Sequence, residues 1–339
     1  MNVTFSHETA LEFLRSVPPQ AGAYSRENLS ISIQTATTGY RDLRKLDLAS
    51  YGISCRPLHV LIEKGTRRCQ SPGVSCHEHG YARLPEGYLL ILGPGVFACG
   101  PELVFIQLAR TLPLIDAVCL GYELCGCYSH FAAEVSGFYD RPPLTTVEAL
   151  AEGIRRHARM RGIDKAREAL RYVRAGSRSP METVTCCLLT LPPSMGGFGF
   201  SVPELNWSVE LDPTAEKLAG TKTCCIDLAW PSAKTGLEYN GRDFHLNHAK
   251  DRRRVEALEH MGWSIKTVEF DQLSDLGQLG TVARLLDGKV ERSAEDEASF
   301  VEKRKLRDAL LRATRSGLGL EDALFGVPVK RGSVAYHVQ

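Results

Sequence analysis

Two acidic residues, Asp227 and Glu238, lie on apolar runs that flank a turn signal, Trp-Pro-Ser-Ala-Lys. The runs, 223–230 and 235–240, are short enough for strands, and the turn between them predicts a hairpin. A turn that is symmetric about its centre places the two acids opposite each other, with Cβ atoms roughly 4.5–5.5 Å apart. Two carboxylates at that distance repel, and a hard divalent cation such as Mg²⁺ binds their oxygens and removes the repulsion. The pair therefore predicts a metal site for chemistry on a phosphate, with Mn²⁺ as the alternative ion.

The neighbouring elements would have to hold this pair in place. Asn240 follows Glu238 by two positions, so both side chains belong to one face of their strand. A helix is predicted over 251–261, because apolar residues recur there at helical spacing before a glycine. Further elements are predicted as a helix over 179–191 and strands over 206–211 and 263–270. The predicted order is helix, three strands, helix, strand.

That order and its polar residues resemble a known nuclease fold. The strand Asp, the Glu-x-polar element, the loop Phe244-His245-x-x-His248 and the Asp-x-x-Arg start of the next helix all contribute. Together they resemble the PD-(D/E)xK nuclease superfamily, in the branch similar to the very-short-patch-repair (Vsr) endonucleases. The resemblance implies an α/β fold with a restriction-endonuclease-like αβββαβ core, and Mg²⁺-dependent hydrolysis of DNA phosphodiester bonds.

The resemblance also assigns roles to individual residues. Asp227 matches the first metal-binding Asp and Glu238 the Glu of the E-x-K element, while His245 matches a histidine that assists the attacking water. For His245, a hydrogen bond to a backbone carbonyl is the structural alternative. Asp251 and Arg254 match the Asp-x-x-Arg pair, which we expect to be an ion pair that fixes the helix start; Arg254 is also a predicted DNA contact.

Asn240 departs from the family, which has lysine at this position or, in this branch, often Asp. A neutral amide stabilises phosphate charge poorly, so the departure bears on catalysis more than on fold. Lys222 and Lys234 are the nearby lysines that could replace the charge, and the spacing favours neither.

Glu182 is open to two interpretations. Ser179, Pro180 and Glu182 form a capping-box arrangement, in which the glutamate only caps the helix that it opens. In the nuclease family the helix before the central strands carries an acidic residue that reaches the metal, and Ser-Pro-Met-Glu-Thr resembles that helix start. The resemblance thus makes Glu182 a third metal ligand beside Asp227 and Glu238.

A basic segment precedes this helix. Residues 141–178 hold ten Arg or Lys residues against four acids, and helices are predicted over 145–160 and 164–175. Spacings of four, three and four place a set of arginines along one helix stripe. The stripe is either a track for a DNA backbone or a solvated helix face. Its members are Arg167, Arg171, Arg174 and Arg178.

The N-terminal part predicts a small sheet followed by helices. Short apolar runs separated by turn residues extend over 57–99, and apolar residues at helical spacing begin at Pro101. With "PLHVLIEKGTRR" and "PELVFIQLARTL", residues 58–128 resemble AbiEi-like antitoxin and transcriptional-regulator proteins. No DNA-reading winged helix is evident before this region, because residues 1–40 are rich in loop-forming residues.

Composition sets the broad class. The chain has 339 residues, of which 43% are hydrophobic and 24% charged, so it is long enough for about two domains. A net charge of +1 gives no overall attraction to nucleic acid, so any basic surface must be local. No apolar run is long enough for a bilayer, and the scattered cysteines predict reduced, mostly buried thiols in a cytoplasmic protein. Zinc on Cys69, Cys76, His77 and His79, or on Cys125 and Cys127, lacks the paired spacing of a structural site.

The predicted domain organisation has four parts. An α+β region over 1–140 is followed by a basic helical connector over 141–178, the nuclease domain over 179–290, and a helix and tail over 291–339. The predicted partner is DNA, with no membrane and with a toxin or other protein partner left open. Three functional classes compete: a Mg²⁺-dependent DNA endonuclease, a catalytically inactive nuclease-fold DNA-binding regulator or antitoxin, and a structural protein whose acids are incidental.

Overall fold

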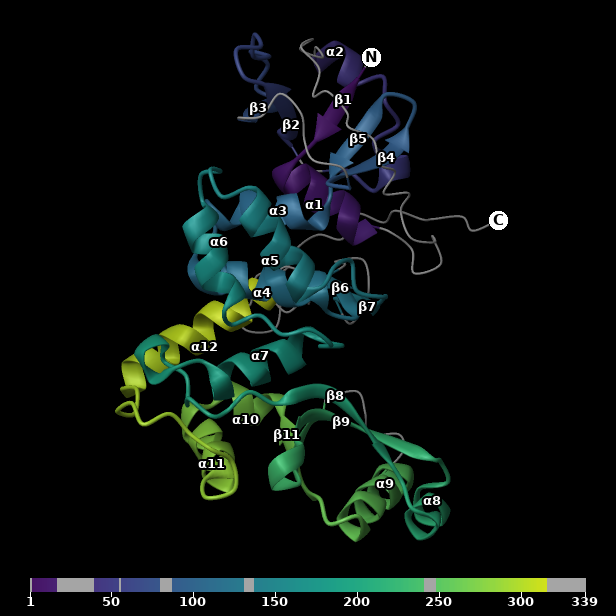
Figure 1. Ribbon diagram of the computed structural model, residues 1–339, viewed down its shortest axis with the longest axis vertical. Coiled ribbons are helices and arrows are strands. Elements are labelled where there is room, and N and C mark those ends of the chain that lie inside the picture. Colours follow the sequence, from purple (N-terminus) through teal and green to yellow (C-terminus); the bar gives the residue numbers. More distant parts are fainter. Residues whose placement is uncertain are drawn as a thin grey trace, which may run out of the picture.

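The structure is a computed structural model of the chain, and it describes residues 2–16, 40–54, 56–79, 87–130, 137–240 and 248–315. Figure 1 shows an N-terminal sheet at one end, a second sheet at the other, and layers of helices between them. The predicted α/β class is confirmed. Both sheets matter for function, because each brings together side chains that the neighbouring helices and loops then enclose.

A five-stranded mixed sheet forms the N-terminal end, in the order β3-β2-β1-β5-β4. Its central strand, β1 (Val3–Phe5), is parallel to one neighbour and antiparallel to the other. The sequence pattern missed this strand, because three residues are too few for a recognisable period and its pairing partners lie more than fifty residues away. The other four strands lie where the apolar runs predicted them: β2 (Leu58–Glu63), β3 (Val74–His79), β4 (Leu89–Gly93) and β5 (Val96–Cys99).

Helices cover this sheet and form the middle of the molecule. α1 (His7–Ser16) and α3 (Pro101–Ala109) lie against each other, and α3 also packs against the helices that follow. The remaining elements of this region are α2 (Tyr40–Leu43), η1 (Ala49–Tyr51), α4 (Leu114–Cys125), the strand pair β6 (Tyr128–His130) and β7 (Phe138–Asp140), α5 (Val147–Arg156) and α6 (Ile163–Leu170).

The second sheet has four strands in the order β11-β10-β9-β8. β8, β9 and β10 are antiparallel neighbours, and β11 is parallel to β10. The order helix, three strands, helix, strand is observed, with one additional short helix, α8, after the first strand. The elements are α7 (Pro180–Thr190), η2 (Pro193–Met195), β8 (Glu204–Glu210), α8 (Pro213–Ala219), β9 (Thr223–Trp230), η3 (Pro231–Ala233), β10 (Thr235–Asn240), α9 (His248–His260) and β11 (Ser264–Glu269).

Three helices end the part of the chain that the structure describes: α10 (Phe270–Ser274), α11 (Leu276–Leu286) and α12 (Phe300–Arg315). α12 packs against both α4 and α7, so it joins the helical middle to the second sheet. The helix expected within 291–339 begins at Phe300, whose side chain is 66% exposed, whereas Leu306 and Leu310 are buried.

One apolar core extends from the N-terminal sheet to the second sheet. It includes Phe5, Phe105, Leu124, Val184 and Leu228. A second, smaller core lies between the four-stranded sheet and α9 and contains residues such as Ile226 and Leu258. Because the larger core crosses the predicted boundaries at 140 and 178, α5 and α6 are packed helices of the middle layer; the four-part domain division itself stays a prediction.

The predicted arginine stripe is wrong in its geometry. α6 ends at Leu170, because the next three N–H groups bond to carbonyls only three residues back and tighten the chain into turns. Val173 then enters the core against Gly121 of α4. Arg174 and Arg178 therefore lie beyond the helix and do not continue the row begun by Arg167.

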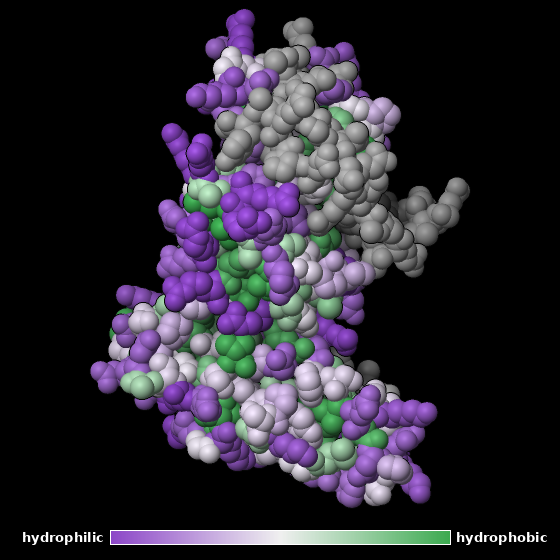
Figure 2. Space-filling view, viewed as in Figure 1, coloured by the Kyte–Doolittle hydropathy of each residue, from purple (hydrophilic) through white to green (hydrophobic). Residues whose placement is uncertain are grey.

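The surface is mixed in polarity. In Figure 2, hydrophilic and intermediate residues cover much of the coloured part of this face, and hydrophobic patches lie along its middle. Within the described part of the chain, no helix combines the length and apolar character needed to cross a bilayer.

Candidate active site

The predicted hairpin is confirmed at both ends. β9 and β10 have the predicted bounds, and their pairs are Thr235 with Trp230, Gly236 with Ala229, and Leu237 with Leu228. The ladder ends there, one pair before Asp227 and Glu238. β10 stays paired with β11 up to Asn240, so it separates from β9 where the two acids begin. The two carboxylates thus lie at the point where neighbouring strands diverge.

The Asp227 side chain takes the place of a backbone acceptor where the β9–β10 ladder has ended. Its Oδ2 accepts a hydrogen bond from the Tyr239 N–H at 2.9 Å. On its other side, the β8–β9 ladder passes from the pair of Leu205 and Leu228 to that of Trp207 and Ile226, without a pair at Asn206 and Asp227. Asp227 therefore lies in a local gap of both ladders, between Asn206 on one strand and Glu238 on the other.

Asn206 is a site residue that the sequence analysis missed. Its φ of +52° lies in the left-handed region, which few residues other than glycine and asparagine adopt. This conformation turns its amide toward α7, where Nδ2 donates to Glu182 Oε2 at 2.7 Å and to Gly176 O at 2.9 Å. An asparagine in an alternating strand pattern was the only available signal for this role.

Glu182 has the capping role that the sequence offered as one of two interpretations, and its carboxylate also lies near Asp227. The Ser179 side chain caps α7 by accepting the Glu182 N–H at 3.1 Å, and the glutamate in turn receives the Ser179 hydroxyl and the Arg178 N–H. The helix cap therefore orients a buried carboxylate toward the four-stranded sheet. There, burial and, to a lesser extent, the proximity of Asp227 raise the pKa of Glu182.

Burial dominates the electrostatics of the three acids. It raises the pKa of Glu182 to about 7, with repulsion from Asp227 adding to the effect. It also raises the pKa of Glu238 to about 7, against the opposing attraction of Arg254. The pKa of Asp227 is raised by burial as well, while the Tyr239 N–H, Arg254 and Arg178 act in the opposite direction. The three groups therefore share one weakly solvated environment.

Arg254 contacts this environment from α9. Its Nη1 donates to the Cys225 carbonyl at 2.6 Å, and its Nη2 forms an ion pair with Glu238 Oε2. The expected Asp251–Arg254 pair at the helix start is replaced by this contact, because the guanidinium reaches across to the sheet. The second oxygen, Glu238 Oε1, is buried and has no hydrogen-bond partner in the part of the chain that the structure describes.

The remaining predicted residues lie at the margin of the site or beyond it. Asn240 is exposed at the end of β10. His245 falls in 241–247, outside the described residues. Lys234 is in the hairpin turn, where its Nζ donates to the Met261 carbonyl at 2.8 Å, so it is directed away from the acids. The positive charges at the site come instead from Arg254 and Arg178.

The other basic residues have local partners. Arg167 is exposed and pairs with Asp164 at 2.7 Å, and Arg174 donates to the carbonyls of Arg171 and Val173. Arg171 is exposed. Of these four arginines, Arg178 has a charge that lowers the pKa of Asp227.

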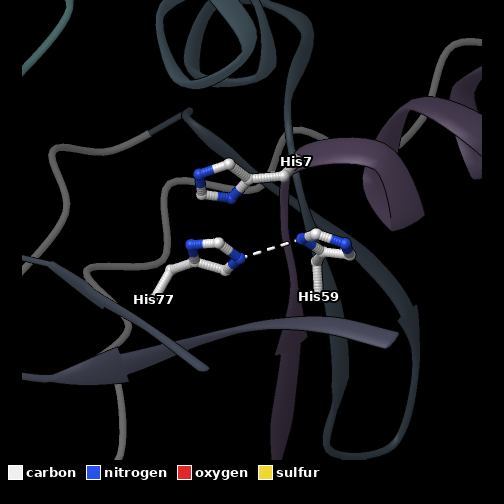
Figure 3. A group of neighbouring side chains, drawn as sticks. All are labelled: His7, His59 and His77. Atoms are coloured by element: carbon white, nitrogen blue, oxygen red, sulfur yellow. Dashed lines mark hydrogen bonds between the residues drawn. The ribbon is translucent and has the colours of Figure 1, made fainter. Parts of the chain in front are cut away.

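Two groups of residues in the structure offer donors for a metal. The carboxylates of Glu182, Asp227 and Glu238 supply hard oxygen donors, but their ligand atoms do not lie within 4.8 Å of one another as a set of three. Among the described residues, one group meets that spacing: His7, His59 and His77 (Figure 3). His77 lies among the cysteine and histidine residues weighed above for zinc, whereas no local pattern in the sequence singles out His7 or His59.

Comparison with known proteins gives little further information. No protein-family model matches the chain, and no solved structure matches it. Two uncharacterized proteins of Mycobacterium tuberculosis, from strains CDC 1551 and H37Rv, are each 27% identical over 132 residues. The match covers 38% of this chain and 44% of each relative, so it spans less than half the length of the curated relatives.

Proposed function

We propose that the chain is a Mg²⁺-dependent DNA endonuclease with a PD-(D/E)xK core of the Vsr-like branch. The observation that supports this best is the convergence of three acids from three elements, α7, β9 and β10, where two strands diverge. The element order helix, three strands, helix, strand is consistent with the same core. The AbiEi-like resemblance of residues 58–128 remains a separate proposal, and it suggests a setting in defence or in a toxin–antitoxin pair.

The donor set fits a hard divalent cation. All three acids present carboxylate oxygens, which Mg²⁺ and Mn²⁺ prefer, and Glu238 Oε1 is buried without a partner in the described chain. When bound, Mg²⁺ would lower the pKa of a water molecule and neutralise charge that develops on the phosphate. Asp227 and Glu238 would hold the ion, with Glu182 as the third acid.

The chain's own residues would then have distinct tasks. The Tyr239 N–H fixes one oxygen of Asp227, and Asn206 fixes one oxygen of Glu182, so each carboxylate has a defined orientation. Arg178 and Arg254 supply the positive charge that Asn240 lacks, and either guanidinium can stabilise a phosphate oxygen. His245, from the resemblance, would accept the proton of the attacking water.

One observation favours a second candidate, a nuclease-fold DNA-binding regulator without catalysis. Arg254 already neutralises Glu238, and this contact competes with a cation for the same carboxylate. A protein that uses this ion pair to stabilise its fold would bind DNA through its arginines and cleave none.

Cleavage of supercoiled plasmid distinguishes the two candidates. The full chain is incubated with Mg²⁺, with Mn²⁺ and with EDTA, beside Asp227→Asn and Glu238→Gln purified in parallel. Glu210→Gln is the matched control, because it removes one acid from an exposed position of the same sheet. We expect metal-dependent nicking by the wild type and the control, and none by the two site variants. If the wild type cleaves no plasmid but still binds DNA in a salt-dependent manner, the DNA-binding regulator is the remaining candidate.

A further inference from the structure

Three histidines from different elements meet beside the N-terminal sheet. His7 begins α1, His59 lies on β2 and His77 on β3, and Figure 3 shows their rings gathered together. His59 Nδ1 lies 2.9 Å from His77 Nε2, and the rings of His7 and His77 stack with centroids 3.6 Å apart. One ligand nitrogen from each residue lies within 4.8 Å of the other two. Among the described residues, no set of three carboxylates brings its ligand atoms equally close together.

The sheet register explains two of the three positions. β2 and β3 are parallel, with His59 paired to Ser75 and Leu61 to His77. His59 and His77 are therefore diagonal neighbours on one face, a distance that imidazole rings can bridge. His7 is brought to them by the central strand β1, whose residue Phe5 pairs with Val60.

His7 is held in an unusual backbone conformation. Its φ of +48° lies in the left-handed region, which is strained for a residue other than glycine. Its N–H donates to Gln107 Oε1 at 3.0 Å, and its ring Nδ1 contacts the Ser6 hydroxyl at 3.0 Å. The second contact occupies Nδ1 and leaves Nε2 for a ligand, as in metal sites whose outer hydrogen bonds fix the imidazole.

The rings of His7 and His77 are neutral at physiological pH. Burial, with repulsion from the other two histidines and Arg110, lowers the pKa of His7 to about 3. Burial, His59, Arg110 and Arg68 lower the pKa of His77 to about 4. Neutral imidazole is the form that binds a metal. Of the nearby charges, Arg68 is already paired with Glu78 at 3.0 Å, and Glu8 Oε2 lies 3.1 Å from His59 Nδ1.

We propose that His7, His59 and His77 form a binding site for a divalent transition metal of the Zn²⁺ class, separate from the carboxylate site. Imidazole nitrogen suits Zn²⁺ and its neighbours in the series, whereas Mg²⁺ prefers oxygen. Tetrahedral Zn²⁺ with Zn–N of about 2.0–2.1 Å separates ligand nitrogens by about 3.3 Å. The 2.9 Å contact between His59 and His77 would open by a few tenths of an ångström. Three protein ligands leave a fourth position for water, beside Glu8.

Titration of the chelator-treated full chain tests the site. Zn²⁺ and Mg²⁺ are each added in competition with a chromophoric chelator. The double variant His59→Gln/His77→Gln removes two ligands and keeps neutral polar side chains, and His260→Gln is the matched control on a half-exposed histidine of α9. We expect one Zn²⁺ per wild-type chain, unchanged binding by the control, and at least about 100-fold weaker binding by the double variant. Mg²⁺ should not compete.

A second measurement keeps the proposal testable if the double variant does not fold. Co²⁺ is added to the wild type and to His7→Gln, and the visible absorption that four-coordinate Co²⁺ produces is recorded. We expect an intense band in the wild type that the variant loses, with circular dichroism showing that the variant is folded. Absence of stoichiometric Zn²⁺ binding by the wild type, or its retention in both histidine variants, would overturn the proposal.

Discussion

The carboxylate site on the second sheet and the histidine site on the first respond to burial in opposite ways. Burial raises the pKa of Glu182 and Glu238 to about 7, which favours protonated acids and opposes a cation. Burial lowers the pKa of His7 and His77, which favours neutral imidazoles with a free electron pair. In both cases low solvation disfavours the charged form. The histidine site is thus ready for a metal at neutral pH, whereas the carboxylate site needs a positive partner, a part that Arg254 plays in the structure.

The largest effect is expected from loss of the central acid. Asp227→Asn keeps the shape of the side chain but removes a metal-binding charge between Glu182 and Glu238. We expect plasmid nicking to fall at least about 1000-fold, equivalent to about 4 kcal/mol of transition-state stabilisation. The measurement is the initial nicking rate in Mg²⁺, with Glu210→Gln as the control. Equal rates for Asp227→Asn and wild type would mean that the carboxylates are not the active site.

The two metal sites are expected to be independent. His59→Gln/His77→Gln should lose at least about 100-fold in Zn²⁺ affinity while Mg²⁺-dependent nicking stays within about twofold. Asp227→Asn should do the reverse, because the ligand sets share no residue. Both assays are run on the same preparations. A loss of nicking in the histidine variant with its fold intact would show that the two sheets are coupled.

Asn206 tests whether backbone strain supports the carboxylate site. Asn206→Ala removes the hydrogen bond to Glu182 and places a Cβ-bearing residue at φ +52° without amide compensation. We expect a loss of about 2–3 kcal/mol in the free energy of unfolding, measured with urea. Asn206→Gly, which accepts this φ, should lose only about 1–2 kcal/mol. Equal losses would assign the whole effect to the amide.

The pH dependence separates the two sites further. Glu182 and Glu238 have a pKa of about 7 in the folded chain and 4.5 as their ordinary value, so the folded state holds more protons between these limits. Without metal, their contribution to stability is therefore full below pH 4.5 and is lost as the pH rises to about 7. Mg²⁺ must displace both protons, so its affinity should fall about 30-fold between pH 7 and pH 6.

Zn²⁺ affinity is the internal comparison for this pH series. His7 and His77 are already neutral in this range, so we expect these two ligands to add no pH dependence to the Zn²⁺ affinity between pH 7 and pH 6. The stability prediction is tested by the melting temperatures of the chelator-treated protein and of Glu238→Gln across the same pH series. An Mg²⁺ affinity that is independent of pH would contradict the assignment of protonated acids at this site.

The smallest effect is expected from the arginines. Arg178 lies beside the acids, whereas Arg167 is paired with Asp164 on an exposed helix face. Arg178→Ala should weaken DNA binding about five- to tenfold at 0.1 M salt and reduce the slope of log affinity against log salt by about 0.9. Arg167→Ala should leave both unchanged. Equal effects would restore the interpretation of the basic segment as one DNA track.

Local patterns in the sequence predicted much of the carboxylate site. The hairpin bounds, the register and the cap formed by Ser179 with Glu182 follow from turn residues, alternation and capping chemistry within a few residues of one another. The helical spacing of the arginines predicted a longer α6 than the structure has. Tertiary packing overrides helix propensity there, because Val173 packs in the core against α4. The predicted partner of Arg254, Asp251, was also wrong, because the observed partner, Glu238, lies on another element.

The histidine site could be predicted only in part. His59 and His77 lie on predicted strands, but their register depends on a parallel pairing that no turn specifies. His7 follows a three-residue strand whose partners are distant in the chain.

The sequence by itself determined the elements whose signals are local, including the strands that hold Asp227 and Glu238 and the helix that Glu182 caps. Only the tertiary structure decided which charges neutralise them, which strands diverge beside them, and which three histidines meet. The physical reason is range: turns, caps and alternation act over a few bonds, whereas burial and strand pairing depend on the whole fold.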